Sequence, residues 1–143
     1  MFMGEYDHTI DTKGRLIIPS KFREELGNEF MVTKGFEDCL FVFPTEEWKK
    51  LADQISVLPL TNTGARELSR KFIAGSAPCE LDKQGRILIP SRAREYAHLE
   101  KDVVVAGMNN HIEIWNSSRY DETDSNSNVN DIAAYLAEIG YTI

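Results

Sequence analysis

The order of apolar and polar residues in the first part of the chain predicts two short strands followed by a short helix. Residues 6–10 and 15–18 mix aromatic, aliphatic and β-branched side chains with polar ones, which is typical of half-buried strands. The segment 11–14 between them, Asp-Thr-Lys-Gly, has turn-forming residues at its first and last positions, so a hairpin is expected. Ser20 is expected to cap the helix and Gly27 to end it.

A second hairpin and an amphipathic helix complete this first unit. Residues 30–33 and 40–43 predict two strands that turn around Gly35. Thr45 is expected to cap the helix that follows. The apolar residues of that helix recur at intervals of three and four, on one face: Trp48, Leu51, Ala52 and Ile55.

The same order of elements returns in the second half of the chain. Residues 58–62 predict a connector, and residues 63–74 predict a helix with Ala65, Leu68 and Phe72 on one side. The remaining elements repeat those of the first unit: a strand at 77–81, a turn at 82–85, a strand at 86–89, a helix opened by Ser91, and strands near Val103 and Ile112.

The last part of the chain differs from both units. Residues 121–130 are rich in Ser, Asn and Asp and predict a polar, mobile linker. Asp131 is expected to cap a final helix that ends before Gly140. The apolar stripe of that helix consists of Ile132, Tyr135, Leu136 and Ile139. We expect the stripe to pack against its own domain or a neighbouring subunit, with a dedicated partner-binding tail as the alternative.

One stretch of 14 residues occurs twice, and it is the most informative feature of the sequence. Residues 11–24 return as residues 82–95, with eight of the 14 positions identical. The best-matched part is a charged turn, Asp-x-x-Gly-Arg, so the two copies present the same surface chemistry twice. The repeat divides the chain into four parts: a first unit at 5–55, a connecting helical segment at 56–75, a second unit at 76–120, and an acidic linker with a helix at 121–143.

Charge is segregated along the chain. The net charge is −7, yet residues 11–23 and 82–94 each carry +3, so the remainder carries −13. Residues 120–143 contain five acids and no Lys or Arg. Two basic windows on an acidic protein favour an anionic partner that binds at the windows and is repelled elsewhere.

Two interpretations of the charged turn remain open at this stage. In one, Asp and Arg four residues apart pair with each other and hold the hairpin, an exposed interaction that contributes about 0–1 kcal/mol. In the other, the arginines bind a ligand, because a guanidinium suits bidentate contact with phosphate or the guanine edge. The duplication favours ligand binding. Gly14 and Gly85 are expected to form the turns, since glycine accepts a positive φ without steric cost.

The duplicated motif Asp-x-x-Gly-Arg-[Leu/Ile]-x-Ile-Pro resembles the MraZ family, bacterial cell-division-cluster regulators built from two tandem AbrB-like repeats. The resemblance covers residues 1–125. It implies a mainly β fold with short helices (α+β), an interlocked-hairpin β-barrel formed by the two repeats. It also implies a ring-like homo-oligomer that binds direct repeats in the promoter of its own cell-division and cell-wall gene cluster, as a repressor.

The resemblance assigns DNA binding to four motif residues, Asp11, Arg15, Asp82 and Arg86. The clustering of charge adds six more candidates for contact with double-stranded DNA: Lys13, Lys21, Arg23, Lys83, Arg92 and Arg94. Lys21 and Arg92 begin short helices, so they could instead be solvated or paired with nearby glutamates. We expect a cytoplasmic protein associated with the nucleoid and no membrane partner.

Other function classes receive little support. The sequence contains no nucleophile elbow, phosphate loop or Cys/His metal spacing, so an enzyme is not expected, nor a metal or cofactor. Cys39 and Cys79 are isolated and are expected to be reduced thiols. An AbrB-like antitoxin, which binds DNA and a toxin partner, is the alternative.

Overall fold

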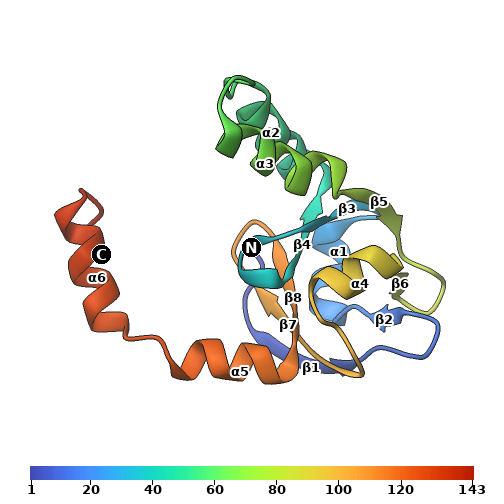
Figure 1. Ribbon diagram of the computed structural model, residues 1–143. Coiled ribbons are helices and arrows are strands. Elements are labelled where there is room, and N and C mark those ends of the chain that lie inside the picture. The colour runs from blue at the N-terminus through green and yellow to red at the C-terminus, as the bar shows by residue number, and fades with distance from the viewer.

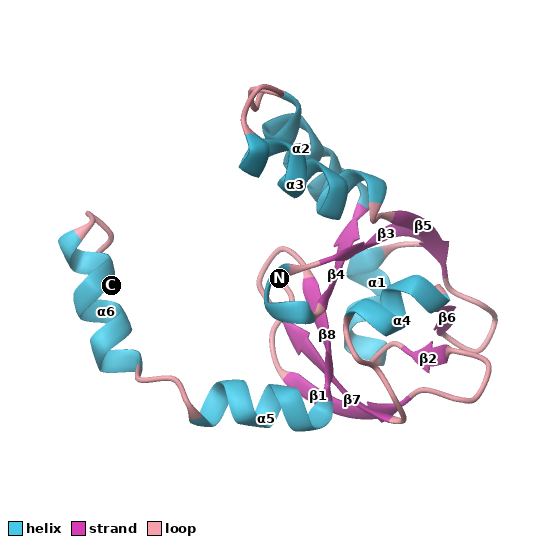
Figure 2. Cartoon of the chain, viewed as in Figure 1, coloured by secondary structure: helices cyan, strands magenta, loops and turns pink.

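The computed structural model describes residues 1–143, which form a mainly antiparallel β structure with short helices (Figures 1 and 2). The expected fold class is therefore confirmed. The strands are β1 (Glu5–Thr9), β2 (Arg15–Ile17), β3 (Glu29–Lys34), β4 (Leu40–Pro44), β5 (Ala77–Glu80), β6 (Arg86–Leu88), β7 (Asp102–Gly107) and β8 (Ile112–Asn116). The helices are α1 (Ser20–Leu26), α2 (Thr45–Ser56), α3 (Thr63–Ser69), α4 (Ser91–Tyr96), α5 (Ser117–Ser125) and α6 (Val129–Glu138), with a 3₁₀ turn η1 (Phe36–Asp38) and a π-helical turn η2 (Arg70–Ala74).

The strands of the two repeats are interlocked in one six-stranded sheet, in the order β1-β7-β8-β4-β3-β5. β1 of the first repeat pairs with β7 of the second, with Tyr6 opposite Val105. β5 of the second repeat pairs with β3 of the first, with Ala77 opposite Val32. The repeat makes β5 the counterpart of β1, β7 that of β3, and β8 that of β4. Exchanging the two strands of each pair gives the same order, read from the other edge of the sheet. The two halves are thus related by a pseudo-two-fold axis that passes between β4 and β8.

Strands β2 and β6 form a separate antiparallel ribbon, in which Leu16 lies opposite Ile87. A single bridge between Ile10 and Leu16 connects this ribbon to the end of β1. The sequence predicted that the strands flanking the turn 11–14 would pair with each other, and this was wrong. The turn forms, but β1 continues along β7 and β2 pairs with β6. Local turn residues fix the reversal of the chain, whereas the choice of partner strand depends on the other repeat.

The four central strands of the large sheet, β3, β4, β7 and β8, are buried on both faces, because both repeats contribute apolar residues at successive positions, whereas the outer strands β1 and β5 are partly exposed. Val103 and Val105 face a cluster of 18 buried residues that also contains the inner side chains of the ribbon, Leu16 and Ile87. Val104, with its neighbours on β4 and β8, faces a second cluster of eight residues beneath α2 and η2. The predicted amphipathic face of α2 packs on this second cluster. The ribbon is therefore fixed to the larger core by its inward side chains.

Helices α1 to α4 lie where the sequence placed them, but three of the expected caps are wrong. Ser20 and Thr45 begin α1 and α2, yet each follows a proline and neither makes a capping hydrogen bond. The Thr45 hydroxyl donates instead to the Glu29 carbonyl oxygen at 3.0 Å. In α6 the cap is Asn128, whose side chain accepts a hydrogen bond from the backbone N–H of Asp131 at 3.1 Å. None of the helices has the length and apolar content needed to cross a membrane.

The C-terminal segment differs from the expected mobile linker. Residues up to Ser125 are helical in α5, and only three residues separate α5 from α6. The Tyr120 hydroxyl donates to the Glu5 carboxylate, and the Tyr120 ring packs on Trp115 with centroids 5.7 Å apart, so α5 is attached to the sheet. Helix α6 stands away from the rest of the molecule (Figure 1), with none of its residues buried. Its stripe does not pack against its own domain, which was one of the two expected contacts.

Both cysteines are free thiols, as the sequence predicted. Burial raises the pKa of Cys39 and Cys79, and the nearby Glu113 and Glu37 carboxylates raise that of Cys39 further. The thiols are therefore protonated and unreactive near neutral pH.

Candidate nucleic-acid interface

The two charged turns have the same hydrogen-bonded geometry. In the first, Asp11 Oδ1 accepts from the backbone N–H groups of Lys13 and Arg15, both at 2.9 Å. In the second, Asp82 Oδ1 accepts from Gln84 at 2.8 Å and from Arg86 at 2.9 Å. Each aspartate side chain thus closes its turn over the same two backbone positions. These bonds fix the direction in which the following strand begins.

Each aspartate also holds the arginine that begins the strand. Arg15 Nε donates to Asp11 Oδ2 at 2.6 Å, and Arg86 Nε donates to Asp82 Oδ2 at 2.8 Å. The predicted ion pairs are therefore present. They use only Nε, and the two Nη atoms of each arginine have no hydrogen-bond partner within the chain. The sequence left open whether Asp and Arg pair with each other or the arginine binds a ligand. The structure shows the pair, and the pair leaves the Nη edge of each guanidinium available to a ligand.

The pKa values of both aspartates reflect this geometry. The backbone N–H of Arg15 is the largest cause lowering the pKa of Asp11. Burial, the next largest effect, raises this pKa, and the Arg15 guanidinium and the backbone N–H of Lys13 lower it further. The same groups of Arg86 lower the pKa of Asp82. Both carboxylates are therefore ionised at neutral pH, which is the form that accepts these hydrogen bonds.

The outer face of the ribbon combines the two arginines with two exposed aliphatic side chains. Arg15 lies opposite Leu88, and Ile17 lies opposite Arg86. Ile17 is 42% exposed and Leu88 is 61% exposed, whereas the alternating positions Leu16 and Ile87 are buried. Ile17 and Leu88 were not among the predicted site residues. The alternation of the strand was the signal that could have found them, because residues two apart share a face.

Arg23 and Arg94 cross to the turn of the opposite repeat. Arg23 Nε donates to the Ile18 carbonyl oxygen at 2.8 Å, and Arg94 Nη1 donates to the Ile89 carbonyl oxygen at 3.1 Å. Arg94 also lies 3.5 Å from the Lys13 carbonyl oxygen, in the first turn. These two arginines were predicted to contact DNA. In the folded chain each of them bonds the end of the ribbon strand in its own repeat. Each also packs against the turn of the other repeat, Arg23 at Gly85 and Arg94 at Gly14.

The turn glycines are required by backbone conformation and also by these arginines. Gly14 has φ +86° and Gly85 has φ +76°, in the left-handed region. A Cβ on Gly14 would lie 1.4 Å from Arg94 Nη1, and one on Gly85 would lie 2.3 Å from Arg23 Cζ. Only a residue without a side chain leaves room for the arginine of the other repeat.

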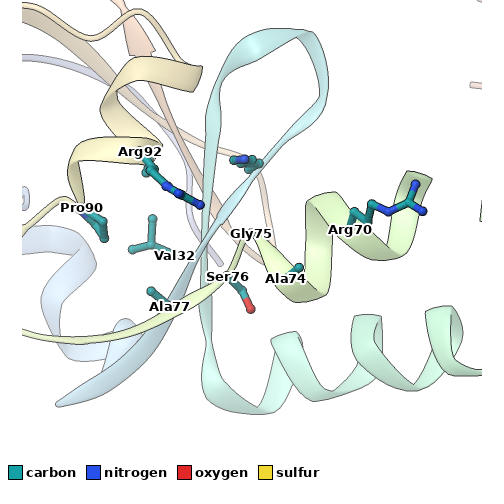
Figure 3. A pocket seen from close by; sticks show the side chains of 10 residues that line it. Val32, Arg70, Ala74, Gly75, Ser76, Ala77, Pro90 and Arg92 are labelled. Carbon is teal, nitrogen blue, oxygen red and sulfur yellow. The ribbon is translucent and has the colours of Figure 1, made fainter. Parts of the chain in front are cut away.

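The remaining predicted bases are exposed and have no acidic partner. Lys13 and Lys83 lie in the two turns at non-equivalent positions, and Lys21 lies in the first turn of α1. None of them forms an ion pair, and neither does Arg92, so pairing with the neighbouring glutamates does not occur. Arg92 points into a cavity of about 400 Å³ that Lys34 also lines (Figure 3).

The fold and this surface define a class of protein with two interlocked repeats that present paired arginines on a rigid ribbon. The description of the family model that matches this chain begins "MraZ protein" and adds "antitoxin-like"; it matches twice, at residues 1–71 and 72–138. The chain belongs to the MraZ family. It is thus similar in sequence over both repeats, and the boundary between the two matches falls in η2.

Relatives of nearly the same length carry the name "Transcriptional regulator MraZ", which denotes a non-enzymatic class. The chain is 50% identical over 141 residues to the protein from Thermoanaerobacter sp. (strain X514), covering 97% of this chain and 99% of that one. It is 53% identical over 140 residues to the one from Lachnoclostridium phytofermentans, covering 98% of each. It is 58% identical over 115 residues to the one from Carboxydothermus hydrogenoformans, covering 80% of each.

Proposed function

We propose that this protein is a transcriptional regulator that binds double-stranded DNA sequence-specifically through the ribbon β2–β6 and its two turns. One observation carries the proposal. Arg15 and Arg86 are each held at Nε by an aspartate of their own turn, and their Nη atoms have no partner within the chain. A guanidinium that is oriented in advance loses less conformational entropy when it binds phosphate or guanine.

The shape of the ribbon supports this assignment. The major groove of B-DNA admits a two-stranded β-ribbon, and an arginine there can donate two hydrogen bonds to guanine. Ile17 and Leu88 lie beside the arginines and offer apolar contacts, which suit the methyl group of thymine. The turns carry Lys13 and Lys83 at opposite ends of the ribbon, because β2 and β6 are antiparallel. We assign these lysines, with Lys21 and Arg92, to phosphate contacts that add affinity without base specificity.

Arg23 and Arg94 receive a different role in this proposal. Arg23 packs against Gly85 and Arg94 packs against Gly14, each in the turn of the opposite repeat, so they support the turns that position the DNA-contacting arginines. They complete a surface in which six basic residues from the two repeats lie on the ribbon or at its turns: Lys13, Arg15, Arg23, Lys83, Arg86 and Arg94. The acidic remainder of the chain repels DNA from the other faces.

We further propose that the protein represses its own cell-division and cell-wall gene cluster by binding direct repeats in the promoter. Membership of the MraZ family supports this role, as does the name of its relatives. One chain presents few base contacts, so we infer a ring-like homo-oligomer whose copies bind neighbouring repeats and gain affinity through effective concentration. Head-to-tail contacts place successive copies in the same orientation, which matches direct repeats. Such a protein works in the cytoplasm, at the nucleoid.

Replacement of both arginines tests the DNA-binding surface. Arg15→Ala combined with Arg86→Ala is expected to weaken binding to promoter direct repeats by about 30-fold or more, since each bidentate contact discriminates by about 1–3 kcal/mol. Lys49→Ala with Lys50→Ala is the matched control, because it removes two exposed positive charges from α2. Gel-shift titration at equal salt measures both. Equal affinities for the two double variants would refute the assignment.

The salt dependence separates base contacts from phosphate contacts. Loss of two phosphate contacts lowers the slope of log affinity against log salt concentration by about 1.8, whereas loss of base contacts leaves the slope unchanged. We expect the smaller slope from Lys13→Ala with Lys83→Ala. We expect an unchanged slope and lost discrimination between promoter and unrelated DNA from the arginine variant.

The alternative function is an antitoxin that binds DNA and a toxin. The description of the family as antitoxin-like favours it, as does the acidic helical tail formed by α5 and α6. A small basic protein that co-purifies with this chain in equal amounts from its native host would support this function. Purification of the chain as a homo-oligomer alone would exclude it.

A further inference from the structure

Helix α6 carries an apolar stripe that nothing in its own chain covers. Three residues of the stripe, Ile132, Tyr135 and Ile139, are 48%, 59% and 52% exposed, and Val129 continues it at 73%. The helix has only 10 residues. Isolated helices shorter than about 12–15 residues are marginally stable in water, so α6 needs a surface against which to pack.

The connection between α5 and α6 holds the stripe away from its own domain. The backbone N–H of Asn126 donates to the Glu122 carbonyl oxygen at 3.1 Å, and that of Ser127 donates to Asp124 at 3.2 Å. Asn128 then caps α6. With every residue of the link hydrogen-bonded or capping, α6 continues outward from the end of α5 (Figure 1). This geometry favours a surface on another molecule.

An uncovered apolar groove lies in the hairpin formed by α2, α3 and η2, which projects from the sheet away from α5 (Figure 1). Its volume is about 540 Å³. Its lining includes Ala52, Ile55, Leu58, Leu60, Arg70 and Ile73. Leu60 is 75% exposed and Ile73 is 39% exposed. We call this surface the hairpin groove. An amphipathic helix that binds in a groove of this kind uses apolar residues spaced three and four apart, as the stripe of α6 does.

The charges of the two surfaces are complementary. Asp131 and Glu138 are seven residues apart and lie along the same flank of the α6 stripe. Arg70 lines the hairpin groove without an ion pair, whereas the neighbouring Lys71 lies over the Tyr96 ring, with its Nζ 4.9 Å from the ring centroid. The acids of the tail would therefore meet Arg70 at the groove, whereas a basic partner helix would be repelled there.

We propose that α6 of each chain docks in the hairpin groove of a neighbouring copy. The stripe and the groove are different surfaces, so each copy donates one helix and accepts another. Such head-to-tail contacts close into a ring when their rotation allows it. The inference rests on the ring-like oligomer of the proposed function and assigns the segment and the surface that build it.

Single charged substitutions on either surface test the docking. Ile132→Glu on the stripe and Ile73→Glu in the groove should each reduce the assembly, measured by size-exclusion chromatography with light scattering, to chains of 16.3 kDa. Ala134→Glu is the matched control, because it places the same charge on the opposite face of α6. It should retain the mass of the unaltered assembly. Circular dichroism of each variant checks that the fold persists. Assembly of Ile132→Glu or Ile73→Glu at full mass, or an unaltered protein of 16.3 kDa, would overturn the proposal.

Cross-linking between two differently tagged chains distinguishes a neighbour from the same chain. One chain carries Ile139→Cys and the other carries Leu60→Cys. Each variant oxidised on its own is the control that shows any cross-linking through the native thiols Cys39 and Cys79. After mixing and oxidation, we expect a disulfide-linked pair that contains both tags. Absence of the mixed pair, with internal cross-linking of a chain that carries both substitutions, would contradict docking between copies.

The DNA-binding proposal and the docking proposal can fail independently. If Arg15→Ala with Arg86→Ala still assembles but binds the promoter as the unaltered protein does, the DNA surface is wrong and the docking stands. If Ile132→Glu remains assembled, the docking is wrong whatever happens at the DNA.

Discussion

Replacement of Gly14 by alanine is the sharpest test of how the two repeats hold each other. Gly14 is buried and has φ +86°. A Cβ there would lie 1.4 Å from Arg94 Nη1 and 3.3 Å from the Ile89 carbonyl oxygen. The Arg94 guanidinium would have to move, and its 3.1 Å hydrogen bond to Ile89 would be lost. We therefore expect Gly14→Ala to destabilise the whole fold and not the turn alone.

The expected magnitude has two parts. A left-handed conformation costs an L-residue about 1–2 kcal/mol. Loss of a hydrogen bond from a charged group to a carbonyl oxygen costs about 1.5–3 kcal/mol. Together they lower the free energy of unfolding by about 2.5–5 kcal/mol, a large share of the 5–15 kcal/mol typical of a domain.

Gly14→Ala in an Arg94→Ala background is the matched control, because it keeps the backbone strain at position 14 and removes the clash. Relative to Arg94→Ala alone, the double variant should lose only the conformational part. Urea denaturation followed by circular dichroism gives the free energy of unfolding of each variant. An equal loss from Gly14→Ala in the two backgrounds would refute the steric argument.

Two further predictions follow from the turns and from the interlocked strands. The pKa values of Asp11 and Asp82 are lowered from the ordinary value of 3.8, chiefly because backbone N–H groups bond the ionised carboxylates. The contribution of these carboxylates to stability is therefore complete above pH 3.8 and is lost as the pH falls through the lowered pKa values. The melting temperature of Asp11→Asn with Asp82→Asn should therefore fall below that of the unaltered chain at neutral pH and converge with it in acid; a constant difference across the pH range would contradict this. A fragment of residues 1–71 should not fold as a monomer, because its β1 lacks β7 and its β2 lacks β6. Cooperative urea unfolding of a monomeric fragment, seen by circular dichroism and light scattering, would show that the repeats do not depend on each other.

Much of the local structure could be predicted from residues close together in the sequence. The bounds of α1 and the turn that begins at Asp11 depend on short-range preferences: apolar spacing, proline before a helix and glycine after it. The duplication also revealed the charged turns and the paired Asp and Arg. The expected ion pairs are present because a side chain four residues away, on the same turn, is within reach without any help from the rest of the fold.

The errors lie where a preference had to be satisfied by distant residues. The capping of α1 and α2 by Ser20 and Thr45 was wrong because the Thr45 hydroxyl finds a distant acceptor, the carbonyl oxygen of Glu29. The polar segment 121–130 was expected to be a linker, but α5 extends to Ser125, anchored to the sheet through Tyr120. Polar composition alone does not reveal such an anchor.

The sequence by itself thus determined that two equivalent charged turns exist, which residues build them, and to which family the motif belongs. The tertiary structure decided which strands pair, because hydrogen bonds between strands are the same for any partner and only the shared core selects β7 for β1 and β6 for β2. It also decided that Arg23 and Arg94 pack on the turns of the opposite repeat, an interaction over 62 to 81 residues of sequence that no local pattern encodes.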